Sequence, residues 1–194
     1  MGVHAQDAGS PLGHRRFTAD EVLRMTEAGI FGEDDRIELV GGEVLEVSPQ
    51  GPDHRSLKDE LHAWLARAYA ATRAHILNQG PLRAGTFGLP EPDLAVVSGS
   101  PRDYLDRHPA GRDTLLVIEI AKSSQERDRL KAADYARGGV PVYWLLDLDA
   151  RRLDIYTDPD PEAERYRQLR SLGEDESAEL PIAREAWDVR SLLP

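Results

Sequence analysis

The sequence contains no cysteine among its 194 residues, and it has only three lysines, Lys58, Lys122 and Lys131. Without cysteine there is neither a disulfide framework nor a thiolate metal site, which is typical of a cytoplasmic protein. No apolar run approaches the roughly 20 residues that a membrane-spanning helix needs, and the first residues lack the apolar core of a secretory signal. We therefore expect a cytoplasmic protein without membrane association, and the richness in Ala, Arg, Asp and Leu suggests a bacterial source.

Basic charge is also scarce. The chain has 35 acidic residues against 24 lysines and arginines, a formal net charge of −11. Proteins that hold nucleic acid mainly through its phosphates usually carry a basic excess. The bulk charge therefore argues against tight nucleic-acid binding. It leaves room for an enzyme with one local basic patch, or for one whose acids are partly neutralised by a bound metal ion.

Length and hydrophobic content favour one domain. With 40% hydrophobic residues, the chain can bury a single sizeable core. Residues 1–15 contain Gly, Ser, Pro and His without apolar periodicity, so we predict a disordered tail there. Residues 16–194 then form the domain, with an acidic C-terminal extension around "GEDESAEL".

Apolar periodicity predicts the elements. Three stretches have helical spacing: 18–29, which Thr18 and Glu21 can open as a capping box, 53–73, and one that begins at Ser123 or Ser124 and ends at Gly138-Gly139. Strand patterns cover 36–49 (a hairpin around Gly41-Gly42), 75–87, 92–98, 114–123, 140–149, 151–159 and a last strand near 166–173. This order predicts an α/β (α+β) fold with one central mixed sheet flanked by helices.

Glu119 is the first candidate for chemistry, because it lies in the middle of the apolar run "LLVIEIA". In a regular strand it shares a face with Val117 and Ala121. A buried, unpaired carboxylate costs several kcal/mol or becomes protonated, so Glu119 needs a metal ion, a lysine or an arginine beside it. A purely structural ion pair with an arginine of the neighbouring helix would satisfy the same need.

Asp93 and Glu91 flank Pro92 at the start of another strand-like run, "LAVV". The proline excludes a central ladder position there, so either acid could also be a solvated loop residue. If the strands that carry Asp93 and Glu119 are neighbours, the two carboxylates converge and require a cation between them. Oxygen ligands of this kind suit Mg²⁺ or Mn²⁺.

Basic and aromatic candidates surround these acids in the sequence. Lys122 follows Glu119 by three residues, so a regular strand sends it to the opposite face unless the strand end turns it. Lys131 shares one side of the next helix with Asp128 and Tyr135. Each lysine could equally be an ordinary exposed residue.

Three further features have open interpretations. His54 could be a hydrogen-bond partner of a site residue, a proton shuttle, or a helix residue without a role. Arg83 could contact a phosphate, but we favour an ion pair with a strand acid. Tyr143 and Trp144 are core or dimer-interface aromatics.

Three segments, "PEPDLAVV", "LLVIEIAKSS" and "DRLKAADYARGGVPVYWLLDLDARRLDIYTDP", closely resemble the Uma-two family, described as putative restriction endonucleases of the PD-(D/E)XK nuclease superfamily. The upstream "RIELVGGEVLEVSPQGPDHRSL" resembles the same family, in which a glutamate precedes a Gly-Glu turn and a Pro-x-His leads into the long helix. The resemblance runs from about Phe17 to Pro159.

The resemblance implies a restriction-endonuclease-like core and a metal-dependent phosphodiesterase. Asp93 matches the aspartate of the "PD" element, Glu119 matches the acid of the "(D/E)XK" element, and Glu38 is similar to an extra upstream glutamate. These three would be the metal ligands. The chain departs from the pattern at Ala121, where the superfamily has its lysine. Lys131 fits a migrated lysine by its spacing to Tyr135, although it follows Asp128 by three residues where four are expected.

Three functions follow as expectations. The first is a Mg²⁺- or Mn²⁺-dependent endonuclease that cleaves DNA, with Asp93, Glu119, Glu38 and Lys131 or Lys122 in catalysis and His54, Glu91 and Arg83 as accessory residues. The second is a nuclease-fold binding or interaction protein that has lost catalysis. The third is a hydrolase of a smaller phosphodiester. Family habit and the strand aromatics also suggest a homodimer.

Overall fold

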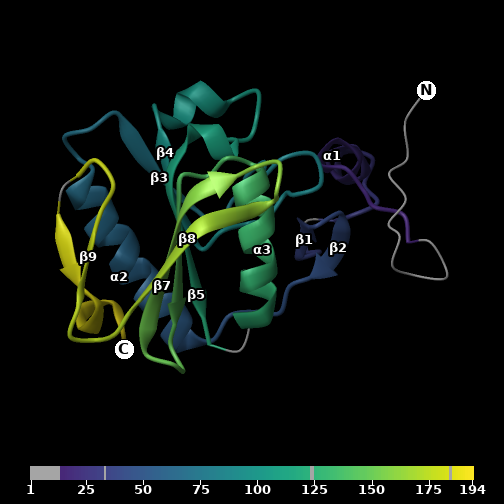
Figure 1. The fold of residues 1–194 in the computed structure, drawn as a ribbon. Helices are drawn as coiled ribbons and strands as arrows, with labels where there is room; N and C mark the ends of the chain where they lie inside the picture. The colour runs from purple at the N-terminus through teal and green to yellow at the C-terminus, as the bar shows by residue number, and fades with distance from the viewer. Residues whose placement is uncertain (1–13, 33, 123–124, 184) are drawn as a thin grey trace.

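The computed structural model describes residues 14–32, 34–122, 125–183 and 185–194, and it is built around one mixed six-stranded sheet (Figure 1). The strand order is β3-β4-β5-β6-β7-β8, in which β5 and β6 are parallel and the other neighbours are antiparallel. The strands are β3 (Ala74–Asn78), β4 (Leu94–Ser98), β5 (Thr114–Ala121), β6 (Val142–Asp147), β7 (Arg152–Asp160) and β8 (Arg165–Leu172). The predicted α/β fold with one central mixed sheet is confirmed.

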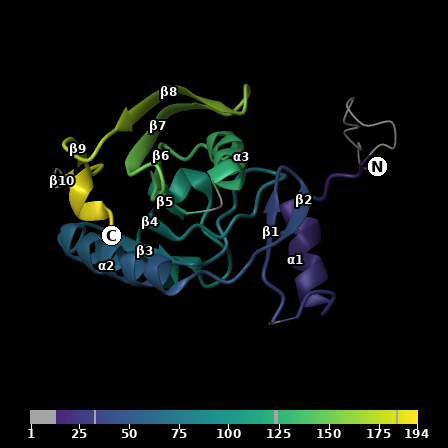
Figure 2. The same cartoon turned by 90° about the horizontal axis from the view of Figure 1, so that it is seen from below.

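Helices cover both faces of this sheet (Figure 2). The long helix α2 (Pro52–Ala68) packs on one face, and α3 (Gln125–Arg137) connects β5 to β6 over the other. The alternation predicted for β5 is confirmed. The core on the α2 side contains Leu116, Ile118 and Ile120. The core on the α3 side contains Val117 and Ala121.

A small N-terminal unit lies beside α3 (Figure 1). It consists of helix α1 (Ala19–Glu27) and the antiparallel hairpin of β1 (Ile37–Val40) and β2 (Glu43–Glu46). The predicted capping box of Thr18 and Glu21 is present. Gly41 and Gly42 both have positive φ, 59° and 88°, which a two-residue turn between right-twisted strands requires.

The acidic C-terminal extension is part of the core. Strands β9 (Ser177–Glu179) and β10 (Ala186–Asp188) form a two-stranded sheet of their own, next to α2 (Figure 2). Ala178, Leu180 and Val189 are buried in the same cluster as the α2 leucines. In the described part of the chain there are also three short 3₁₀ helices: η1 (Pro101–Tyr104), η2 (Gly111–Asp113) and η3 (Val189–Leu192).

Some predicted boundaries were wrong. The helix predicted over 53–73 ends at Ala68, and the strand predicted over 75–87 ends at Asn78, where Gly80 and Pro81 follow. The predicted helix start at Ser123 or Ser124 lies outside the described residues, as does the predicted tail except for residues 14 and 15. None of the helices in the described ranges is both long and apolar enough to cross a lipid bilayer.

The aromatics of β6 are core residues. Tyr143 and Trp144 are 0% and 1% exposed, and they lie on opposite faces of an inner strand. They therefore cannot form a dimer contact, and the suggestion of a homodimer loses this part of its basis.

We expect the α2 side of the core to dominate stability. Replacing Leu65, which is fully buried in that cluster, by alanine should destabilise the fold by about 2–5 kcal/mol, because both transfer energy and a cavity are involved. Chemical denaturation measures this loss. Glu60→Ala, on the exposed side of the same helix, is the control and should unfold at nearly the wild-type denaturant concentration. Equal effects of the two substitutions would contradict the packing described here.

Candidate active site

A cavity of about 940 Å³ opens where the β1–β2 hairpin, the start of α2, the end of β5 and the first turns of α3 meet. Most of the residues singled out in the sequence line it: Glu38, His54, Glu91, Asp93, Glu119, Lys122 and Lys131. Arg83 does not. Seven acidic side chains and four lysines or arginines line the cavity, a formal excess of three negative charges.

The sheet register brings Asp93 to Glu119. Asp93 comes immediately before β4, which pairs with β5 antiparallel so that Leu94 lies opposite Ile118. The amide of Asp93 consequently faces Glu119 and donates to its Oε2 at 3.4 Å. The two strands are thus neighbours, which is the condition under which the sequence analysis expected the two carboxylates to converge. Pro92 does not interfere, because it lies outside the ladder.

Lys131 lies between two of the predicted acids. Its Nζ donates to Glu38 Oε1 at 2.9 Å and to Glu119 Oε1 at 3.0 Å, and all three residues are at most 4% exposed. The hydroxyl of Tyr135, one helical turn further along α3, also donates to Glu119 Oε1 at 2.6 Å. The spacing predicted that Lys131 and Tyr135 lie on one side of the helix, and both side chains do contact Glu119.

The charges in this cluster do not balance. Burial raises the pKa of Glu119, the charge of Lys131 lowers it, and the charges of Asp93, Asp128 and Glu38 raise it further, so that the pKa lies above its usual range. Burial lowers the pKa of Lys131, but the three carboxylates of Glu119, Glu38 and Asp128 outweigh that effect and raise it. We conclude that the lysine stays charged, and that one ammonium group is too few for the surrounding acids.

Asp93 has a separate set of partners. Its Oδ2 accepts from the amide of Ile120 at 2.9 Å and lies 3.1 Å from His54 Nε2, and its Oδ1 accepts from Gln50 Nε2 at 2.5 Å. Burial raises the pKa of Asp93, but these hydrogen bonds and the charge of His54 hold it below its usual value.

His54 therefore lines the cavity and is a hydrogen-bond partner of Asp93. Its Nε2 is also 2.8 Å from the carbonyl oxygen of Ile120, and since both of its neighbours are acceptors, Nε2 must carry the hydrogen. Burial lowers the pKa of His54, whereas the hydrogen bond and charge of Asp93 raise it more, with a net upward shift. His54 Nδ1 is buried without a hydrogen-bond partner among the described residues.

The residues suit a divalent cation in their chemistry. Glu38, Asp93 and Glu119 supply the oxygen ligands that Mg²⁺ and Mn²⁺ prefer, and Glu38 Oε2 is buried with no partner in the described part of the chain. Lys131 and His54, however, already contact one oxygen of each of these carboxylates. Within the described ranges no three His, Asp or Glu side chains form a group that could hold a metal ion. The three-carboxylate ligand set stays a prediction.

The other sequence candidates lie further out. Lys122 is exposed at the end of β5 and forms an ion pair with Asp53 across the rim of the cavity. The amide of Glu91 donates to Glu38 Oε1 at 3.2 Å, while its side chain is at the exposed edge. Arg83 pairs with Asp20 of helix α1, Nη2 to Oδ1 at 2.7 Å. The preferred ion pair is thus present, but with a helix acid rather than a strand acid, and away from the cavity.

Two residues escaped the sequence analysis. Gln50 was not singled out, although it follows Pro49 in the loop that leads to α2. Lys58 was noted only for its rarity, yet it is 5% exposed on α2, four residues after His54. Burial lowers the pKa of Lys58, and the charge of Asp93 partly offsets this. Its position between Leu57 and Leu61, on the apolar side of a helix, was the available signal.

Fold and cavity together define a class: a nuclease-like α/β protein whose sheet presents a buried cluster of carboxylates and one lysine between its flanking helices. Comparison with known families agrees. The model of the Uma2 family, described as "Putative restriction endonuclease", matches residues 19–191. The chain belongs to this family, as the resemblance implied.

One solved structure shares the fold across nearly the whole chain. It is the crystal structure of "a putative nuclease belonging to DUF820" from Anabaena variabilis, with a TM-score of 0.69. The alignment covers 91% of this chain and 97% of that one at 18% sequence identity, so it speaks for the fold alone. No curated protein matches the chain.

Lys131 should be essential for the stability of the free protein. Lys131→Met removes the buried ammonium from between Glu38 and Glu119 and should cost about 3–5 kcal/mol, measured by denaturant unfolding. Lys122→Met is the matched control, because that lysine is exposed and should alter stability little.

A double variant tests the cause. Lys131→Met leaves the Glu119 carboxylate without its ammonium partner. The double variant Lys131→Met/Glu119→Gln removes that carboxylate as well, so part of the lost stability should return. If the double variant is as unstable as the sum of the two single variants, the Lys131–Glu119 pair is not coupled as described.

Proposed function

We propose that the chain is an endonuclease that hydrolyses phosphodiester bonds of DNA with Mg²⁺ or Mn²⁺ as cofactor. Membership of the Uma2 family and the nuclease-like fold support a nuclease in general. One observation carries the more specific proposal: Glu38, Asp93, Glu119 and Lys131, which come from four separate parts of the chain, are all buried and all line one cavity.

Charge balance supports the metal dependence. The cavity already has an excess of acids, and a phosphodiester would add another negative charge to it. A divalent ion held by Asp93, Glu119 and Glu38 would offset both. When bound, such an ion stabilises negative charge that develops on the phosphate and lowers the pKa of a coordinated water.

The chain's own residues would position the substrate and the acids. Lys131, held by Glu38 and Glu119, presents a permanent positive charge beside the position where a scissile phosphate would lie. His54 and the amide of Ile120 fix the carboxylate of Asp93 by hydrogen bonds to one of its oxygens. Preorganised charges of this kind need no rearrangement during the reaction, which is why they lower its barrier.

A smaller phosphodiester is the second candidate substrate. The net charge of −11 and the acidic cavity both weaken electrostatic attraction to a polyanion. These features matter less for a substrate with one phosphodiester group. A nuclease-fold binding protein without catalysis is the remaining alternative. A homodimer, a cytoplasmic location and a bacterial source are further predictions of the sequence.

Cleavage of supercoiled plasmid tests the proposal. The wild-type protein should nick or linearise it in Mg²⁺ or Mn²⁺, and EDTA should stop the reaction. Asp93→Asn and Glu119→Gln should each reduce the rate by a factor on the order of 100 or more, because each removes charge from the reacting centre. Glu60→Gln, on the exposed face of α2, serves as the control and should cleave normally.

The outcomes separate the candidates. Cleavage that survives Glu119→Gln would identify a contaminating nuclease. Hydrolysis of bis(p-nitrophenyl) phosphate without any cleavage of DNA would favour the small-substrate enzyme. A protein that binds DNA but hydrolyses neither substrate in any divalent metal would be the binding protein.

A further inference from the structure

A second hollow lies at the other end of α3. It has a volume of about 330 Å³ and is lined by Asp20, Arg83, Gly85, Thr86, Ala110, Arg112, Arg137 and Gly138. Three of these residues are arginines and one is an acid, and two further acids, Asp134 and Glu164, pair with Arg137. In a chain whose net charge is −11, three arginines around one hollow are a local concentration of basic side chains.

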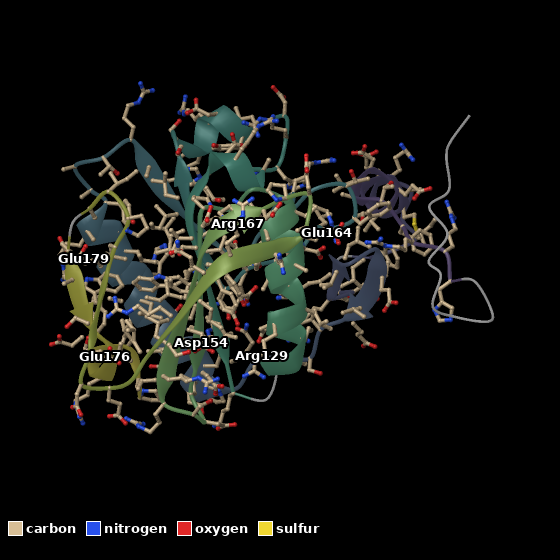
Figure 3. The ribbon with its side chains drawn as sticks, in the orientation of Figure 1. Arg129, Asp154, Glu164, Arg167, Glu176 and Glu179 are labelled. Atoms are coloured by element: carbon tan, nitrogen blue, oxygen red, sulfur yellow. The ribbon has the colours of Figure 1, made fainter. Side chains whose placement is uncertain are left out.

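The arginines come from three segments, two of which are joined by backbone hydrogen bonds. Arg83 and the segment of Arg112 are joined by two hydrogen bonds, from the amide of Arg83 to the carbonyl of Pro109 at 2.8 Å and from the amide of Gly111 to the carbonyl of Arg83 at 3.0 Å. Arg137 is the last residue of α3. It forms an ion pair with Asp134 and donates from Nε and Nη2 to the two carboxylate oxygens of Glu164, at 2.8 and 2.6 Å. Glu164 lies in the turn between β7 and β8, where Figure 3 labels it.

Part of the wall is bare backbone. A Cβ added at Gly138 would come within 2.8 Å of Ala84 Cα, and Gly85, with a φ of +81°, faces the Arg137 side chain at 3.0 Å from where its Cβ would be. The hollow is therefore rigidly framed. Ion pairs hold the guanidinium groups of Arg83 and Arg137 in place before any ligand arrives, which reduces the entropy lost on binding.

The positive charge is only partly compensated. Arg83 has Asp20, and Arg137 has Asp134 and Glu164, but Arg112 is exposed and has no acidic partner among the described residues. The positive charge of Arg83 also affects a neighbouring histidine. Burial lowers the pKa of His108, and the charge of Arg83 lowers it further. The C-terminal end of α3 contributes about −0.5 of a charge, which is smaller than the single positive charge of Arg112.

We propose that this hollow, the arginine site, binds a backbone phosphate of DNA that flanks the bond cleaved in the carboxylate cavity. Guanidinium groups suit phosphate oxygens through paired, charge-assisted hydrogen bonds. Lys131 and Arg137 are six residues apart on α3, about 9 Å along the helix axis. B-form DNA has one phosphate per strand for about every 3.4 Å of its axis, so for a duplex whose axis runs along α3 the separation corresponds to about three nucleotides. This inference rests on the proposed function, because it takes DNA as the substrate.

The arginine site also answers the charge objection. A strongly acidic chain needs at least one place where a polyanion is attracted, and the carboxylate cavity is acidic itself. Purely structural ion pairs would explain Arg83 and Arg137, which tie α1 and the β7–β8 turn to the core. They do not explain Arg112, whose substitution therefore distinguishes binding from structure.

The test measures DNA binding by fluorescence anisotropy, with Ca²⁺ in place of Mg²⁺ to suppress hydrolysis. Arg112→Gln should weaken binding of a long duplex by about tenfold, because one charged hydrogen-bonding contact is lost. It should also lower the slope of log K against log salt concentration by about one. On a dinucleotide, whose single phosphodiester cannot occupy both sites, the difference should largely vanish.

The control is Arg102→Gln, another exposed arginine, on η1 and outside both hollows. Both variants should keep the wild-type melting temperature and only Arg112→Gln should lose affinity. Equal affinities of the two variants for the long duplex would overturn the arginine site while leaving the proposed nuclease intact. Loss of phosphate-ion binding in Arg112→Gln without loss of DNA binding would make it a site for the free anion and overturn it too. Absence of DNA binding by the wild-type protein would overturn the proposed function as well.

Discussion

The need to compensate buried carboxylates governs this structure. Glu38 and Glu119 are almost completely buried, and a single ammonium group, that of Lys131, lies within hydrogen-bond distance of both. Removing such charges from water costs several kcal/mol each unless opposite charge and hydrogen bonds replace the lost hydration. One lysine and the Tyr135 hydroxyl do this incompletely, which leaves Glu38 Oε2 without a partner among the described residues. A site that is short of positive charge in this way is suited to acquiring a cation.

The fold is arranged to bring this cluster together. The parallel pair β5–β6, with α3 as its connection, places Glu119 and Lys131 on facing elements, and the antiparallel partner β4 adds Asp93 from its start. The hairpin of the N-terminal unit then covers the opening and contributes Glu38. None of these elements could hold its charged residue buried alone. Local misfolding of the hairpin, the crossover or the sheet would leave a charge without its partner, so the site and the fold depend on one another.

The two hollows along α3 differ in the charged side chains that line them. The carboxylate cavity, near the beginning of the helix, has excess acid and suits a metal ion. The proposed arginine site, at its end, gathers three arginines, of which Arg112 has no ion pair among the described residues. A single rigid helix joins them, so their spacing does not depend on loop conformation. The net charge of the whole chain does not show this difference, because it adds up side chains that line two separate hollows.

Local pattern determined much of this architecture, because alternation and capping act between residues close in sequence. The two faces of β5, the Thr18–Glu21 cap, the Gly41-Gly42 turn and the order of helices and strands all followed from it, and the family motif pointed to Asp93 and Glu119. Only the tertiary structure decided which lysine meets Glu119, that Arg83 pairs with Asp20 rather than with a strand acid, that Lys58 is buried near Asp93, and that the aromatics of β6 are core residues. These outcomes depend on contacts across 12 to 93 positions of sequence, such as Lys131 with Glu119 and with Glu38. Such contacts are set by how whole elements pack, and no local periodicity encodes them.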